Sequence, residues 1–158
     1  MFNIGDKIVY PMHGAGVIEA IEEKEILGEK RNYYVLRMPI GDMKVMVPTT
    51  NVEAIGLRKI IGGEEVKKVF NILQQDNSPM SSNWNRRYRH NMEKIKSGNI
   101  YELAEVVRNL TARDREKGLS TGEKKMLDNA RQILLSELVL AKDGEREEIE
   151  SLLEKYLA

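Results

Sequence analysis

The chain has 158 residues, of which 41% are hydrophobic, and its formal net charge is zero. This length fits one ordinary domain or two small ones with a core, and a neutral chain taken as a whole argues against nucleic acid as a partner. The chain has no cysteine, which excludes disulfides, a thiol nucleophile and thiolate metal sites, so a reducing cytoplasm is the expected location.

The first part of the chain, residues 1–56, is predicted to form a small β domain. Strands are expected at 7–11, 14–26, 31–39 and 43–48. The linking segments MHGAG, LGEK and IGD each contain a glycine, which tight turns favour. Four or five strands in so few residues cannot form a sandwich with a deep core. The pattern therefore predicts a small, strongly bent barrel.

From residue 57 to 158 the hydrophobic period changes from two to nearly four, which predicts a compact helical domain with a short break near 76–82. Asn99 with Glu102, and Ser120 with Glu123, have the spacing of capping boxes before apolar stripes. Gly118 and Gly144 occupy helix-ending positions. The apolar stretch at 133–141 is too short to cross a bilayer, so no membrane association is expected.

Charge is unevenly distributed along the helical part. Residues 84–131 hold 12 basic and 7 acidic side chains, whereas residues 132–158 hold 3 and 7. A local basic face is therefore compatible with zero net charge. An ordinary solvated helical surface explains the same counts equally well.

No catalytic set or metal site is expected. His13 and His90 lie in different predicted domains, and neither has the spacing of metal ligands. The segment HGAG at 13–16 lacks the spacing of phosphate-binding loops, so a turn is predicted there. The acidic tail is most simply a solvated helix face. The sequence thus predicts a protein that is not an enzyme and needs no cofactor.

The segment SSNWNRRYRH holds the chain's only tryptophan, Trp84, at the start of a helix expected from about Asn83 to Lys96. At about 100° per residue, Trp84, Tyr88 and Met92 share one stripe of this helix, and arginines spread over the remaining surface. Two interpretations remain open. The ring can be a core residue, or it can meet nucleic-acid bases while the helix start and arginines contact phosphates.

Four segments together resemble the CarD/CdnL family of bacterial RNA polymerase-binding transcription regulators: FNIGDKIVYPMHGAGVIEAIE, NWNRRYRHNMEKIKSGN, AEVVRNL and GLSTGEKKMLDNARQIL. The resemblance runs from residue 2 to about 157, in the same order of β domain and helical domain. Its start alone is shared with the polymerase-interacting domain of the Mfd transcription-repair coupling factor. The helical domain that carries tryptophan makes the resemblance specific to this family.

The resemblance implies that residues 1–56 form a Tudor-like domain that pairs a strand edge with the β subunit of RNA polymerase, which is recognition by β-augmentation. The residues that match this surface are Lys24, Met43, Lys44, Val45, Met46 and Val47. Met46 replaces an arginine found in some relatives. The polymerase contact is therefore expected to be less electrostatic here.

The resemblance also implies that residues 57–158 contact promoter DNA at the upstream edge of the transcription bubble. Trp84 is expected to act as a wedge in the minor groove, and the residues expected near phosphates are Arg86, Arg87, Arg89 and Lys124. The implied function is stabilisation of the open promoter complex by a monomeric, cytoplasmic protein that joins the nucleoid through polymerase. The alternative is a non-catalytic protein–protein adaptor without DNA contact, in which Trp84 is core.

Overall fold

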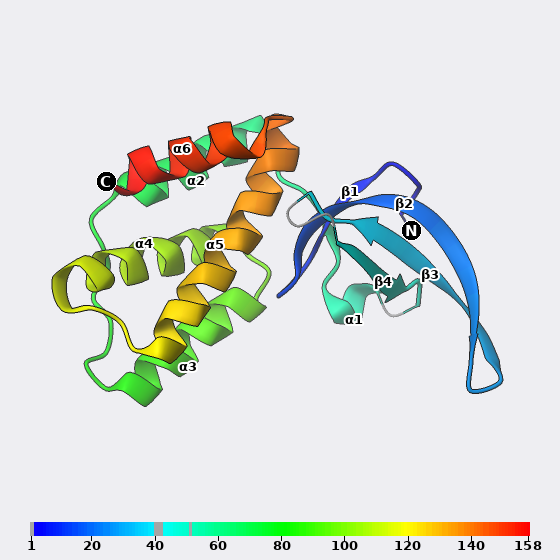
Figure 1. Cartoon of the computed structure of the whole chain (residues 1–158), viewed down its shortest axis with the longest axis horizontal. Helices are drawn as coiled ribbons and strands as arrows, with labels where there is room; N and C mark the ends of the chain where they lie inside the picture. Colours follow the sequence, from blue (N-terminus) through cyan, green and yellow to red (C-terminus); the bar gives the residue numbers. More distant parts are fainter. Residues whose placement is uncertain (1, 40–42, 51) are drawn as a thin grey trace.

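The computed structural model describes residues 2–39, 43–50 and 52–158. The expected IGD turn at 40–42 lies outside the described residues. Within the described part, a β domain is followed by a helical domain that lies beside it (Figure 1). The elements of the β domain are β1 (Lys7–Tyr10), β2 (Gly14–Ile26), β3 (Glu29–Arg37), β4 (Lys44–Pro48), α1 (Val52–Ile55) and β5 (Arg58–Lys59).

The strands form one antiparallel sheet in the order β4-β3-β2-β1-β5. The long strand β2 shifts its register against β3 between Ile18 and Ala20, and such bulges increase the local twist. The sheet is accordingly strongly curved (Figure 1). Its concave side is filled by buried side chains that include Ile8, Ile18 and Leu36. The predicted small, bent β domain is confirmed.

Two elements of this domain were not predicted, namely the short helix α1 and the strand β5. Arg58 and Lys59 have no apolar alternation, and they join the sheet only through backbone pairing with Val9 and Ile8. The sheet therefore continues to Lys59, past the expected domain boundary at residue 56.

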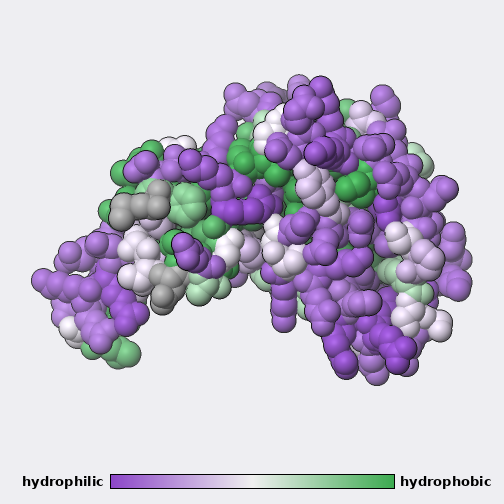
Figure 2. All heavy atoms as spheres, turned by 180° about the vertical axis from the view of Figure 1, so that it is seen from behind, coloured by the Kyte–Doolittle hydropathy of each residue, from purple (hydrophilic) through white to green (hydrophobic). Residues whose placement is uncertain are grey.

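Beyond the ends of β1 and β4, the strands β2 and β3 continue as a two-stranded arm (Figure 1). Figure 2 shows this arm as a mostly hydrophilic projection with a hydrophobic tip. Leu27 and Gly28 form the two-residue turn, with φ angles of 53° and 81°. Two positive φ angles are typical of a type I′ turn, which favours asparagine followed by glycine. Leu27 is 99% exposed, so none of the described residues packs against its side chain to offset the cost of its left-handed conformation.

Replacing Leu27 with asparagine is therefore expected to stabilise the arm by about 0.5–1 kcal/mol, because asparagine adopts the left-handed conformation at lower cost. Hydrogen exchange of the arm amides measures this local opening free energy. Leu27→Ala is the control, because it removes the exposed side chain without this conformational advantage. Equal protection in the asparagine and alanine variants would contradict the turn assignment.

The helical domain consists of α2 (Gly63–Gln74), α3 (Trp84–Lys96), α4 (Ile100–Lys117), α5 (Thr121–Lys142) and α6 (Arg146–Leu157). Its core includes Val69, Leu110, Leu134 and Leu153. The helix α5 lies between the other helices and the sheet (Figure 1), and contacts α4, α6 and β2. No helix in the described part of the chain is long and apolar enough to cross a membrane.

The helix starts agree with the sequence, because the side chains of Asn83, Asn99 and Ser120 each accept a hydrogen bond from a backbone N–H of the following turn. Two details differ. The Glu123 side chain bonds to Arg87 across the domain instead of completing a capping box. The residue in left-handed conformation that ends α5 is Asp143, with a φ of 50°, rather than Gly144.

Candidate functional site

The first candidate surface is the free edge of β4, which pairs with β3 on one side only in the described sheet. Met38 N donates to Met43 O at 2.8 Å, and Thr49 N donates to Asn32 O at 3.0 Å. Hydrogen-bonded pairs alternate along an antiparallel ladder, so the backbone groups of every second β4 residue bond to β3. The backbone N–H and C=O groups of the residues in between, Lys44 and Met46, therefore point outward along the free edge.

Side chains along this strand alternate as a period of two requires. Met43, Lys44 and Met46 are exposed, and Lys44 Nζ lies 3.4 Å from Glu19 Oε2. Val45 is half-buried and Val47 is fully buried in the core of the β domain. Val47 was expected at the polymerase surface, but its side chain points inward and holds the strand on the core.

Lys24 lies apart from this edge. It is exposed on the arm, opposite Arg31 of β3, so β3 separates it from β4. Its Nζ is 4.0 Å from Glu22 Oε2. The structure therefore places the expected polymerase residues in two groups, the β4 edge and the arm.

The second candidate surface surrounds Trp84 at the first turn of α3, where this residue is 42% exposed. The ring stacks on Tyr88, with ring centroids 5.0 Å apart and planes 18° apart. Its Nε1 donates a hydrogen bond to Ser120 Oγ at 2.9 Å. Gly122 lies against the ring, since a Cβ there would be 3.5 Å from Trp84 Cζ2. Trp84 is thus held in place on one side and open to solvent on the other.

Basic side chains lie on both sides of the aromatic stripe of α3. Arg89 lines a groove of about 390 Å³ together with Trp84 and Tyr88. Arg86 lines a second hollow of about 310 Å³, which also contains His90. Lys124 is exposed in the first turn of α5, the helix whose cap Ser120 holds the indole. Three of the four expected phosphate contacts are therefore exposed on the helix starts that meet at Trp84.

Arg87, the fourth, is not at the surface. Its side chain is 3% exposed and forms a bidentate ion pair with Glu123, Nε to Oε2 at 2.8 Å and Nη2 to Oε1 at 3.1 Å. Its Nη1 also donates to Ser81 O at 3.0 Å. Arg87 lies about 100° around the helix from Arg86 and about 160° from Arg89, which turns it toward α5. It thus joins the segment before α3 to the start of α5.

This ion pair changes the proton affinity of both groups. The hydrogen bond from Arg87 lowers the pKa of Glu123, although burial opposes this shift. The same bond raises the pKa of Arg87. Both groups therefore remain charged near neutral pH and hold the base of the Trp84 site in one geometry.

Sequence reasoning identified Ser120 only as a helix cap and missed its bond to the indole. Its spacing to Glu123 signalled the cap, but no local pattern connects it to a residue 36 positions earlier. The described residues contain no cluster of three or more potential metal-binding His, Asp or Glu side chains.

Comparison with known proteins identifies both domains. Residues 2–61 match the model of the CarD-like/TRCF RID domain, an RNA polymerase-interacting domain, and residues 68–154 match that of the CarD C-terminal domain. The "Putative transcription factor YdeB" of Bacillus subtilis (strain 168) is 50% identical over 151 residues, which cover 96% of this chain and 99% of that relative. The solution NMR structure of the 72-residue N-terminal domain of Myxococcus xanthus CarD is 39% identical, covers 37% of this chain and 79% of that one, and has a TM-score of 0.33. The chain therefore belongs to the CarD family of transcription regulators.

Proposed function

We propose that this protein binds the β subunit of RNA polymerase through the free edge of β4 and stabilises the open promoter complex by placing Trp84 against DNA at the upstream edge of the bubble. The observation that carries the proposal is the state of Trp84. The ring is half exposed, oriented by Ser120 and Tyr88, and accompanied by exposed basic residues.

The polymerase contact is supported by the backbone of β4. Outward N–H and C=O groups at Lys44 and Met46 can extend the sheet by one strand from a partner, with main-chain bonds providing affinity. The side chains of two exposed methionines, Met43 and Met46, lie along the same edge and offer adaptable apolar contacts to the partner. Such a contact depends less on salt than one made by arginine.

Replacing Met46 with proline tests this geometry. Its N–H points away from β3, so proline leaves the β3–β4 ladder intact but removes an outward donor. We expect polymerase capture to weaken about tenfold or more, because a bond at the centre of the added strand is lost. The affinity is measured by passing purified polymerase over the surface-immobilised protein. Met46→Leu keeps the N–H and should bind normally, and equal binding by the proline and leucine variants would contradict β-augmentation at this edge.

The DNA contact is supported by three exposed positive charges. The low DNA affinity that they predict also fits a protein that reaches DNA only when it is bound to polymerase. Three exposed cations, Arg86, Arg89 and Lys124, predict a log–log salt slope of about −3 and a non-specific dissociation constant on the order of 10⁻⁴ to 10⁻⁶ M. Such binding alone does not select a promoter. Tethering through polymerase raises the local concentration to roughly millimolar, which is enough to populate the contact.

Binding at the bubble edge also explains why the protein would stabilise the open complex and not the closed one. Wedging a ring between base steps costs a few kcal/mol of unstacking, and this cost is lower where the duplex is already distorted. The protein therefore binds the open state more tightly than the closed duplex. A ligand shifts an equilibrium only through such a difference in affinity, so the open complex gains stability.

The test is co-purification of polymerase with tagged protein, followed by measurement of open-complex lifetimes on several promoters with and without the protein. We expect both capture and longer lifetimes. Failure of capture would refute the polymerase contact, and capture without any change in lifetime would refute stabilisation of the open complex.

The second candidate is a protein–protein adaptor without DNA contact. The stacking of Trp84 on Tyr88 favours it, because the same packing suits a structural residue. Trp84 is the chain's only tryptophan, so its fluorescence distinguishes the two functions. A spectrum changed by bubble DNA supports the regulator, and one that bubble DNA leaves unchanged supports the adaptor.

A further inference from the structure

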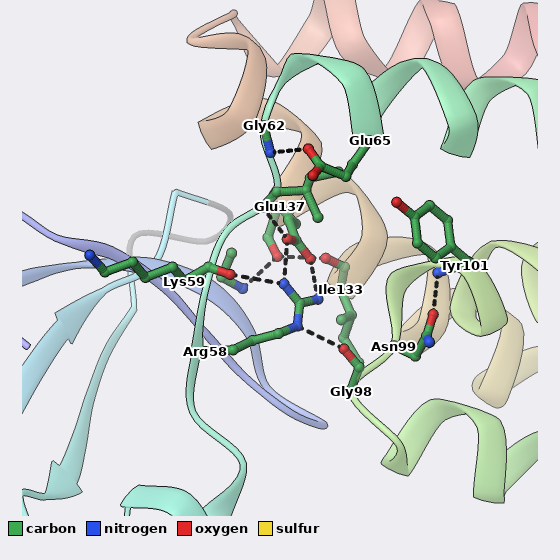
Figure 3. Close-up of polar contacts among 12 residues, drawn as sticks. Arg58, Lys59, Gly62, Glu65, Gly98, Asn99, Tyr101, Ile133 and Glu137 are labelled. Atoms are coloured by element: carbon green, nitrogen blue, oxygen red, sulfur yellow. Dashed lines mark hydrogen bonds and ion pairs between the residues drawn. The ribbon is translucent and has the colours of Figure 1, made fainter. Parts of the chain in front are cut away.

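The two domains meet at a polar cluster in which one arginine of the sheet contacts two parts of the helical domain (Figure 3). Arg58 of β5 bonds through Nη1 and Nη2 to both carboxylate oxygens of Glu137 in α5, each at 2.8 Å. Its Nε donates to Gly98 O, in the turn between α3 and α4, at 2.9 Å. Ile61 N, just after β5, donates to Glu137 Oε2 at 3.0 Å. We call Arg58, Glu137, Gly98 and Ile61 the interdomain clamp.

A second set of contacts lies next to the clamp along α5. Ser136 Oγ accepts a hydrogen bond from Ala15 N of β2 at 2.8 Å. At Gly14 an added Cβ would lie 2.7 Å from Ser136 Oγ, so the backbone approaches this closely only because the residue is glycine. Lys7 Nζ of β1 donates to Leu140 O at 3.3 Å. One face of α5 is therefore bonded to three strands of the sheet.

The clamp is suited to fixing an orientation. The Glu137 side chain is only 3% exposed, and it receives three hydrogen bonds, two from Arg58 and one from Ile61. A bidentate arginine–carboxylate pair allows little rotation of either partner, since two parallel bonds define a plane. The Arg58 side chain is 32% exposed, so the penalty for breaking the pair comes from the Glu137 carboxylate, which would be left buried and unpaired. Domains in one chain otherwise move relative to each other by default.

The clamp is connected to both elements that carry the Trp84 site. Gly98 follows the end of α3, and Glu137 lies on α5, whose cap Ser120 holds the indole. At a rise of about 1.5 Å per residue, α5 spans about 25 Å between Ser120 and Glu137. The sheet connects the clamp to β4, since β5, which carries Arg58, and β4 are the two edge strands of the sheet. Continuous secondary structure thus joins the β4 edge to Trp84 through Arg58 and Glu137.

We propose that Arg58 and Glu137 are positioning residues that hold the β4 edge and Trp84 in one fixed relative geometry, so that polymerase docking determines where the ring meets DNA. The functional consequence rests on the function proposed above, whereas the fixed orientation does not. A loose junction leaves both binding surfaces intact but spreads Trp84 over a larger volume, which lowers its effective concentration at the bubble.

The orientation is measured in the free full-length chain by pulsed electron–electron spin resonance. The native sequence has no cysteine, so Glu53→Cys and Lys117→Cys, both at exposed positions, place one label in each domain. We expect one narrow distance distribution with the clamp intact and a broad one with Glu137→Gln or Arg58→Lys. The lysine variant keeps a positive charge beside Glu137, so it also serves if Glu137→Gln does not fold. Glu154→Gln is the matched control, because it weakens a 3.6 Å ion pair between α6 and Arg131 of α5 away from the junction.

The functional measurement uses the same variants without labels. We expect polymerase capture and duplex DNA affinity to match those of the unmodified protein, and the gain in open-complex lifetime to fall about tenfold. A narrow distribution in both clamp variants would overturn the proposal, as would a broad distribution with an unchanged lifetime. If the unmodified protein gives no gain in lifetime, the proposed function fails, and the distance distributions still decide whether the clamp sets the orientation.

Discussion

Replacing Trp84 with alanine is expected to shorten the lifetime of open complexes while leaving polymerase capture unchanged. Stacking of one base on an aromatic side chain contributes about 1–3 kcal/mol, which corresponds to about 5- to 150-fold in affinity. The loss of lifetime cannot exceed the total gain that the protein provides. Dissociation of preformed complexes after addition of a competitor measures the lifetime directly.

Trp84→Phe is the matched control. It keeps an apolar ring at the same position but loses the Nε1 donor that bonds to Ser120. We expect it to retain part of the lifetime gain, because ring insertion survives while the orientation of the ring loosens. Since the indole is half exposed, neither variant should unfold the domain, which circular dichroism verifies. An unchanged lifetime with folded Trp84→Ala would refute the wedge.

The contacts behind the indole explain why a single exposed ring can have a large effect. A freely rotating side chain loses rotamer entropy when it is immobilised, at about 0.5–1.5 kcal/mol. Trp84 has already lost much of this freedom through its stacking on Tyr88 and its bond to Ser120. Immobilising the Trp84 side chain on DNA therefore offsets less of the free energy of stacking than it would for a freely rotating ring.

Most of the fold was predictable because local patterns determine it. Alternating side chains and glycine turns located β1 to β4, and the capping residues Asn99 and Ser120 located two of the helix starts. The strand β5 could not be found this way, since Arg58 and Lys59 carry no alternation and pair through their backbones. Tertiary contact alone makes these two residues a strand.

The candidate site was predictable only in part, because exposure depends on partners distant in sequence. Helical periodicity separates Arg87 from Arg86 and Arg89, since Arg87 shares a face with the buried Asn91 and Ile95. Only the position of Glu123 on α5 supplies the partner with which an arginine is buried there. For β4 the expected surface position of Val47 was wrong, although the strand period carries the signal for its burial. Val45 and Val47 share one face of a half-buried strand, so an outward side chain was to be expected only at alternate positions such as Met46. The pairing of Arg58 with Glu137 has no local signal at all.

Replacing Arg87 with methionine is expected to lower the stability of the helical domain by about 3–5 kcal/mol, because it leaves the Glu123 carboxylate buried and unpaired. The two side chains are 3% and 2% exposed, so water cannot take the place of the lost partner. Urea unfolding followed by the fluorescence of Trp84 measures this selectively, since the only tryptophan lies in the same domain. Exposed Arg86→Met is the matched control and should change stability by less than about 0.5 kcal/mol.

The double variant Arg87→Met with Glu123→Leu separates the charge effect from packing. Removing both charges from a buried site is often neutral or stabilising, so we expect it to recover most of the lost stability. Acid provides a second check. The folded-state pKa of Glu123 lies below its usual value, so the pair contributes fully above the normal carboxylate range and loses its contribution as pH falls through that lowered pKa. The loss of stability caused by Arg87→Met should also become smaller as pH falls, because protonation neutralises the unpaired carboxyl of Glu123. A penalty that is independent of pH, together with a double variant no more stable than the single one, would mean that Arg87 acts through packing and its bond to Ser81.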